Sequence, residues 1–135
     1  MDPRPDALLA ESWSRLAPHQ EALAAAFYDR LFHLEPRVRD LFAAADMDVQ
    51  PEKFVAMLGH LVRLGGEPDR LAAELQASGG RHASYGVTAR HYRLGGEALL
   101  WALDRVAPGG LDAPTRHAWA EAYTRMASLM QRRPA

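Results

Sequence analysis

Apolar residues recur at intervals of three and four positions along almost the whole chain, and this spacing constrains the fold more than any other feature. After Phe54, for example, the pattern continues with Met57, Leu58, Leu61 and Val62. Side chains at these intervals share one face of an α-helix, which has about 3.6 residues per turn. Alanine, leucine and arginine are abundant and β-branched residues are few, which also favours helix. We therefore predict an all-α fold without a sheet.

Prolines and glycines divide the first half of this pattern into helices. The first helix is predicted to end at Ala17-Pro18, and the second before Glu35-Pro36, because a residue that precedes proline disfavours helical geometry. Pro36 can open a short third helix, and Pro51 suits the first turn of a fourth. Gly65-Gly66 is expected to end that fourth helix.

The next segment places one histidine between two helices. Pro68 is expected to start a short helix, and Gly79-Gly80 to close it. His82 follows this glycine pair, and Gly86-Val87 forms a corner before the next helix. In this interpretation His82 points into the space between the two helices.

The last third of the chain predicts two long helices. Thr88 is suited to cap the first of them, which Pro108-Gly109-Gly110 breaks, and Asp112 or Thr115 can cap the second. Gly95-Gly96 inside the first long helix lowers its stability, so we expect another backbone or a ligand to approach closely there. The total is six to seven helices of irregular length, which favours steep crossings around a pocket over a symmetric four-helix bundle.

Length and composition exclude several classes of protein. The 135 residues suffice for a single domain spanning 1–135, and the net charge of −1 offers no basic surface for nucleic acid. The chain has no cysteine, so it has neither disulfides nor thiolate ligands. It begins without a secretion signal and contains no apolar run long enough for a membrane. We expect a soluble, cytoplasmic protein that binds a small neutral ligand.

The spacing of the histidines argues against a bare metal ion that is bound by several side chains. Their spacing includes neither the two-histidine zinc helix nor the carboxylate–histidine pattern of di-iron bundles. A metal carried in a macrocycle needs only one protein ligand, which this sequence offers in His82. The six histidines are His19, His33, His60, His82, His91 and His117.

Several segments, taken in order, resemble the bacterial single-domain globins, which include the Vitreoscilla-type bacterial haemoglobins and are similar to the haem domain of flavohaemoglobins. The resemblance covers nearly the whole chain, and the joint occurrence of the segments is more specific than any one of them. The segments are Phe27-Tyr28-Asp29-Arg30-Leu31-Phe32, Glu35-Pro36 through Leu41-Phe42, Gln50-Pro51-Glu52-Lys53-Phe54, Arg81-His82 with Gly86-Val87 and His91-Tyr92, and Ala118-Trp119 with Ala122-Tyr123.

The resemblance implies a globin fold around haem b, the iron protoporphyrin IX. His82 matches the proximal ligand that binds the iron, which leaves the opposite side for a diatomic gas. Tyr28 matches a distal tyrosine whose hydroxyl donates a hydrogen bond to the gas. Gln50 matches a distal glutamine, which is either a second donor or a partner that orients the Tyr28 hydroxyl.

Further contacts to the haem are implied at six positions. Lys53 and Arg81 match candidates for the haem propionates, and for Lys53 a solvated surface lysine is an equal alternative. Phe54 lies four residues after Gln50 on the same helix face, where its bulk would narrow access to the iron. The remaining matches are Phe42, which stacks on the macrocycle, Val87 at the haem edge, and Tyr92 behind the proximal histidine.

One departure from the flavohaemoglobin pattern affects the predicted chemistry. In that group a glutamate and a tyrosine matching Tyr92 make the proximal imidazole more basic. The glutamate would fall about eleven residues after Tyr123, where this chain has Pro134. The chain also ends where a flavin and nicotinamide reductase would begin. Both features argue against a self-sufficient enzyme.

The leading hypothesis is therefore a haem protein, monomer or homodimer, that binds dioxygen tightly as a store or scavenger. The alternative is a nitric oxide dioxygenase that removes nitric oxide with electrons from a separate reductase. A third interpretation needs no catalysis: a gas sensor, or a purely protein-binding helical domain without haem. Peroxidase-like activity is a minor possibility.

Overall fold

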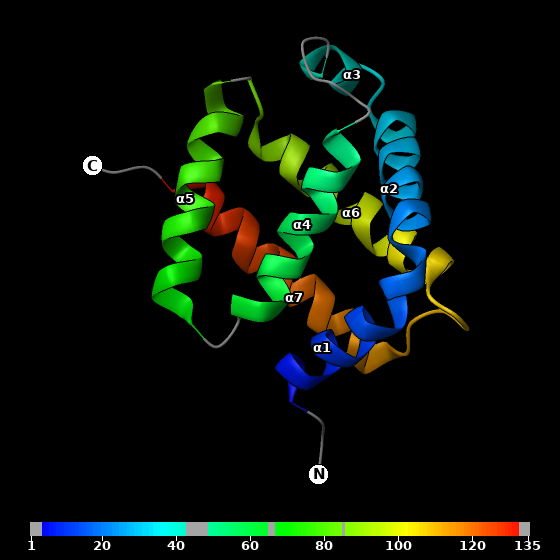
Figure 1. Cartoon of the computed structure of the whole chain (residues 1–135). Coiled ribbons are helices and arrows are strands. Elements are labelled where there is room, and N and C mark those ends of the chain that lie inside the picture. Colours follow the sequence, from blue (N-terminus) through cyan, green and yellow to red (C-terminus); the bar gives the residue numbers. More distant parts are fainter. Residues whose placement is uncertain (1–3, 43–48, 65–66, 85, 133–135) are drawn as a thin grey trace.

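A computed structural model describes residues 4–42, 49–64, 67–84 and 86–132. This part of the chain is helical and contains no strand, which confirms the predicted all-α class. None of its helices is both long and apolar enough to cross a membrane. The elements are α1 (Pro5–Leu16), the 3-10 turn η1 (Ala17–His19), α2 (Gln20–Leu34), α3 (Val38–Leu41), α4 (Gln50–Arg63), α5 (Pro68–Ser84), α6 (Ala89–Val106) and α7 (Ala113–Gln131) (Figure 1).

Local sequence signals set most helix ends where they were expected. Helix α1 ends immediately before Ala17-Pro18, and Pro51 lies in the first turn of α4. Thr88 caps α6 through a reciprocal pair of hydrogen bonds with His91: each side chain accepts from the backbone N–H of the other residue. Asp112 caps α7 by accepting from the N–H of Thr115 at 2.9 Å. The predicted helix end at Gly65-Gly66 lies outside the described residues.

One predicted boundary was wrong. Helix α5 does not close at Gly79-Gly80 but continues through both glycines to Ser84. A Cβ atom on Gly79 would lie 1.7 Å from the backbone oxygen of Met130 in α7. The absence of a side chain at Gly79 therefore permits the backbones of α5 and α7 to approach each other. Glycine lowers the stability of the helix at this position but does not end it.

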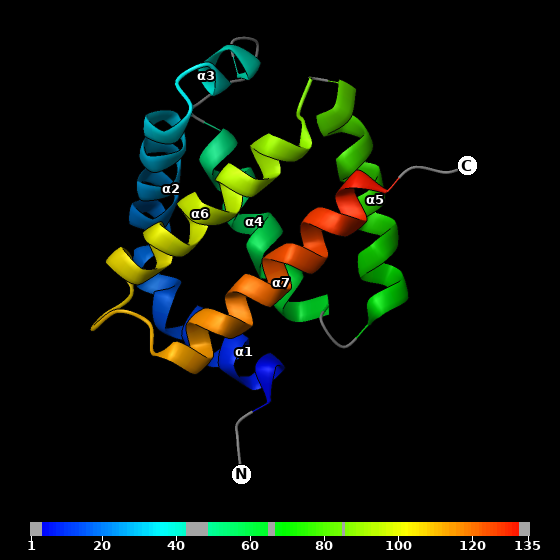
Figure 2. The same cartoon turned by 180° about the vertical axis from the view of Figure 1, so that it is seen from behind.

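The helices cross one another in pairs (Figure 1). Helix α2 packs along α6, and α4 packs against α2 and α1. Helix α7 packs against α1, α6 and α5. The extensive contact of α5 is with α7, and the His60 ring of α4 lies 3.8 Å from the Glu74 carboxylate of α5. Seen from behind, α6 and α7 lie side by side across the molecule (Figure 2).

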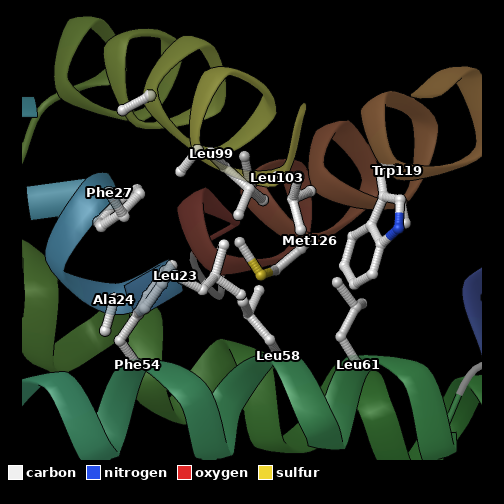
Figure 3. Close-up of a cluster of buried hydrophobic side chains, with 14 of the residues drawn as sticks. Leu23, Ala24, Phe27, Phe54, Leu58, Leu61, Leu99, Leu103, Trp119 and Met126 are labelled. Atoms are coloured by element: carbon white, nitrogen blue, oxygen red, sulfur yellow. The ribbon is translucent and has the colours of Figure 1, made fainter. Parts of the chain in front are cut away.

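The hydrophobic core lies where α2, α4, α6 and α7 meet (Figure 3). Burying a large apolar side chain stabilises the fold by about 1.5–3 kcal/mol. Trp119 is fully buried, and its indole N–H donates to the Ser12 hydroxyl at 2.9 Å. Trp13 lies against it, with ring centroids 6.1 Å apart. The labelled core residues are Leu23, Ala24, Phe27, Phe54, Leu58, Leu61, Leu99, Leu103, Trp119 and Met126.

Candidate functional site

His82 lies in the last turn of α5 and is half-buried. It is therefore part of a helix, and not a residue that follows one, as the sequence had suggested. Its Nδ1 atom is 2.8 Å from the backbone oxygen of Ser78, one turn earlier. A carbonyl oxygen can only accept a hydrogen bond, so Nδ1 carries the hydrogen. In this tautomer of the imidazole, Nε2 is the nitrogen that can offer a lone pair to a metal.

The corner that follows His82 forms as predicted. Gly86 has φ +90°, in the left-handed region that favours glycine. The backbone N–H of Val87 donates to the carbonyl of His82 at 3.1 Å, which ties the corner to the end of α5. The Val87 side chain is half-buried and packs against the core. The corner therefore holds Val87 close to the turn of helix that carries His82.

Tyr92 lies beside His82. It occupies the first turn of α6 and is buried, and its ring centroid is 6.4 Å from that of His82 with an interplanar angle of 33°. The Tyr123 hydroxyl of α7 donates to the Tyr92 carbonyl. Residues from α5, α6 and α7 thus meet behind the imidazole.

The glycine pair of α6 makes room for Tyr123. A Cβ on Gly95 would lie 2.6 Å from the Tyr123 hydroxyl oxygen, and one on Gly96 would lie 2.8 Å from its ring. The expected partner of this pair was a backbone or a ligand, and that expectation was wrong because the close neighbour is a side chain. Burial raises the pKa of the Tyr123 phenol far above its ordinary value, and the neighbouring Tyr92 contributes to the rise.

Tyr28 lies in the middle of α2, buried among aromatic rings. The rings of Phe42 and Phe54 meet it edge to face, with centroids 5.7 and 5.8 Å away. Phe54 in turn stacks on Phe27 at 4.1 Å, and Phe32 lies 6.0 Å from Tyr28. The four phenylalanines of the chain therefore surround one phenol.

The Tyr28 hydroxyl has a polar partner in this apolar surrounding. The side chain of Gln50, in the first turn of α4, lies close enough to lower the pKa of the phenol as a hydrogen-bond donor. Burial raises the pKa of the Tyr28 phenol, and the hydrogen bond from Gln50 lowers it to a smaller degree, because an amide N–H stabilises the phenolate. The phenol is thus neutral at ordinary pH and able to donate a hydrogen bond.

The predicted site residues form two groups. Gln50, Phe42 and Phe54 surround Tyr28. Near His82, the backbone of Val87 is hydrogen-bonded to the His82 carbonyl, and the ring of Tyr92 lies beside the imidazole. Lys53 of α4 and Arg81 of α5 are exposed. Among the described residues no three or more carboxylates and histidines gather as a metal-ion site.

A family model described as Globin matches residues 25–130 of the chain. The chain belongs to the globin family. Membership implies that it binds haem and, through it, diatomic gases.

Individual relatives of this globin differ in length and in description. It is 24% identical to the anaerobic nitrite reductase HBII of Casuarina glauca over 93% of this chain and 88% of that protein. It is 29% identical to a flavohemoprotein of Rhizobium meliloti over 85% of this chain, and 28% identical to one of Bordetella pertussis over 96%. The globin spans 29% and 33% of those two longer proteins.

A solved structure confirms the globin fold. It is a Pseudomonas aeruginosa protein described as structurally highly homologous to a human haemoglobin. The two structures agree with a TM-score of 0.83 and 26% identity, over 95% of this globin and 96% of the other chain.

Two residues of the site were missed from the sequence. Ser78 is the acceptor for His82, and its position four residues earlier would have revealed it had α5 been continued through the glycines. Tyr123 contacts α6 behind the site. The signal for it was the glycine pair at Gly95-Gly96, which indicates a bulky neighbour but does not identify it.

Proposed function

We propose that this globin binds haem b through the Nε2 atom of His82 and holds dioxygen and other diatomic gases on the opposite side. The observation that carries the proposal is the hydrogen bond between His82 Nδ1 and the Ser78 carbonyl, 2.8 Å long. This bond fixes the tautomer and the direction of the ring before any cofactor arrives, as second partners of metal-bound histidines do. The bound haem supplies an iron with one further position for a gas.

Tyr28 and Gln50 serve as the distal pair in this proposal. The Tyr28 phenol keeps its proton at neutral pH, because a tyrosine loses it only near pH 10 and burial raises the pKa of Tyr28 further. The hydrogen bond from Gln50 to the phenol oxygen restricts the direction of the remaining O–H. An O–H of fixed direction stabilises a ligand that carries partial negative charge more than a freely rotating one does. Tight binding and slow release follow, which suit storage or scavenging of oxygen.

The aromatic residues around Tyr28 limit access to the distal side. Phe54 stacks on Phe27 and is buried, so its ring cannot turn aside cheaply. Excluding water lowers the local dielectric and strengthens the hydrogen bond from Tyr28. In the same proposal Phe42 and Val87 contact the macrocycle, and Lys53 and Arg81 are the candidates for its propionates.

Replacing His82 tests the proposal. His82→Gly should bind haem weakly and lose the Soret spectrum of a histidine-bound haem, and added imidazole should restore that spectrum. A matched control is His33→Gly, because His33 is exposed and lies in the last turn of α2. If His82→Gly kept the haem with the same axial ligation, the proposed site would be wrong.

A second function is supported by the likeness to the two flavohemoproteins. The same site would convert nitric oxide, dioxygen and one electron to nitrate, with the electron from a separate reductase. Repeated additions of nitric oxide to the oxygenated protein separate the two functions. A gas binder consumes one equivalent and stops, whereas a dioxygenase continues for as long as a reductase and its reductant are present.

A further inference from the structure

A surface groove of about 730 Å³ runs between α6 and α7, the two helices that face the viewer in Figure 2. Residues of α6 from Ala89 to Leu100 and of α7 from Ala120 to Arg132 line it. Its volume lies in the range of about 300–1,000 Å³ that is common for binding sites. Tyr92 and Tyr123, which meet behind His82, are both among the lining residues.

The groove carries basic side chains on a chain whose net charge is −1. Arg93 and Arg132 line it, and its described lining includes no aspartate or glutamate. A second hollow on the outer side of α7 adds Arg125 and one carboxylate, Glu121. Charge of one sign concentrated in a concave surface attracts and orients a partner of the opposite sign.

The same groove lies a short distance from the proximal histidine. The ring of Tyr92 is 6.4 Å from the ring of His82, centroid to centroid. The Tyr123 hydroxyl donates to the Tyr92 carbonyl, so both aromatic side chains join the groove to the back of the imidazole. Electron transfer weakens steeply with distance. A redox group bound in the groove would therefore be separated from the iron ligand by few residues.

We propose that the groove between α6 and α7 is the docking site of an acidic electron-donor protein. The inference rests on the second proposed function, in which a separate reductase supplies the electron to the iron. One electron leaves the reduced flavin or iron–sulfur group of the donor, which is oxidised, and ferric iron takes it up and becomes ferrous. No atom is exchanged. The arginines select the donor by charge, and Tyr92 and Tyr123 provide the contact path to His82.

The test uses a flavodoxin, a small acidic protein that carries a flavin, as the probe. Amide shifts of the haem-loaded globin are followed by NMR during titration with the probe at low and high salt. We expect shifts along the groove, at the amides of Thr124 and Ser128, that disappear at high salt because counter-ions screen the charges.

A charge-reversal pair and a matched control make the test specific. R93E/R125E should weaken flavodoxin binding about tenfold or more, within the range that electrostatic steering covers. R37E/R116E makes the same change in net charge at exposed arginines outside both hollows, and should weaken binding far less. The rate at which reduced flavodoxin reduces the ferric protein should follow the same order.

Three outcomes would overturn the docking site: equal affinities for the two double variants, shifts confined to another face, or no salt-sensitive binding of the flavodoxin. Carbon monoxide binding to protein reduced with dithionite separates this failure from failure of the proposed function. R93E/R125E should bind the gas as the unaltered chain does, because dithionite replaces the donor. Failure of the unaltered chain to bind it would overturn the proposed function itself.

Discussion

Alanine substitutions at two adjacent glycines of α5 should change stability in opposite directions. Alanine is the better helix former by about 1 kcal/mol, so each substitution gains that amount from propensity alone. At Gly80 no atom lies within 4 Å of the added Cβ, and the gain remains. At Gly79 the Cβ would lie 1.7 Å from the Met130 oxygen and 2.4 Å from its carbonyl carbon. Backbone cannot rotate away, so α5 must move by more than an ångström.

The cost of such overpacking is about 3 kcal/mol, the upper end of the usual range. Gly79→Ala should therefore lose about 2 kcal/mol net, and Gly80→Ala should gain up to about 1 kcal/mol. Urea unfolding of the haem-free chain measures both free energies, and about 1 kcal/mol corresponds to about 4 °C in Tm for a domain of this size. Gly79→Ala should also release haem faster, because His82 lies one turn further along α5. Equal stability of the two variants would refute the close approach of α5 and α7.

Three further predictions concern single side chains. Tyr28→Phe should raise the dioxygen dissociation rate about tenfold, because the loss of one hydrogen bond worth about 1.4 kcal/mol changes the rate by that factor. An unchanged rate in stopped-flow measurements would show that Tyr28 has no distal role. Ser12→Ala should lower the free energy of unfolding, measured in urea, by about 1–3 kcal/mol, because it leaves the buried indole N–H of Trp119 without its acceptor. The control Ser14→Ala, at an exposed position of the same helix, should lower it little. The free energy of unfolding should be constant from neutral pH to about pH 10 and fall above it, because the unfolded chain ionises Tyr123 near the ordinary value while burial raises its folded pKa. Tyr123→Phe should weaken that fall, and an identical pH profile would contradict the prediction.

The fold was predictable where short-range signals decide it. Proline in a first turn, threonine or aspartate at a cap, and the three-to-four apolar spacing are local properties. They placed the end of α1 and the starts of α4, α6 and α7 correctly. The predicted helix end at Gly79-Gly80 was wrong because a glycine pair is compatible both with a helix end and with a close contact between helices. The close contact is with Met130, which lies on α7, far along the chain.

The resemblance named candidate site residues one by one, but it did not say which side chains they contact. It proposed His82, Tyr28 and Gln50 separately, and it left open whether Gln50 orients the tyrosine. The hydrogen bond between Gln50 and Tyr28 depends on how α2 crosses α4, which residue spacing does not encode. The acceptor of His82 depended on the course of α5, and the role of Tyr123 on the fit of α7 against α6. The groove between those two helices likewise exists only in three dimensions.

The residues on the two sides of the proposed haem have separate supports. Tyr28 and Phe54 belong to helices that pack on each other, whereas His82 belongs to a helix whose extensive contact is with α7. If the proposed assignment holds, substitutions that alter gas affinity can accumulate on α2 and α4 without disturbing the helix that anchors the cofactor. The rate of gas release and the retention of the cofactor could then be changed independently, by evolution or by design.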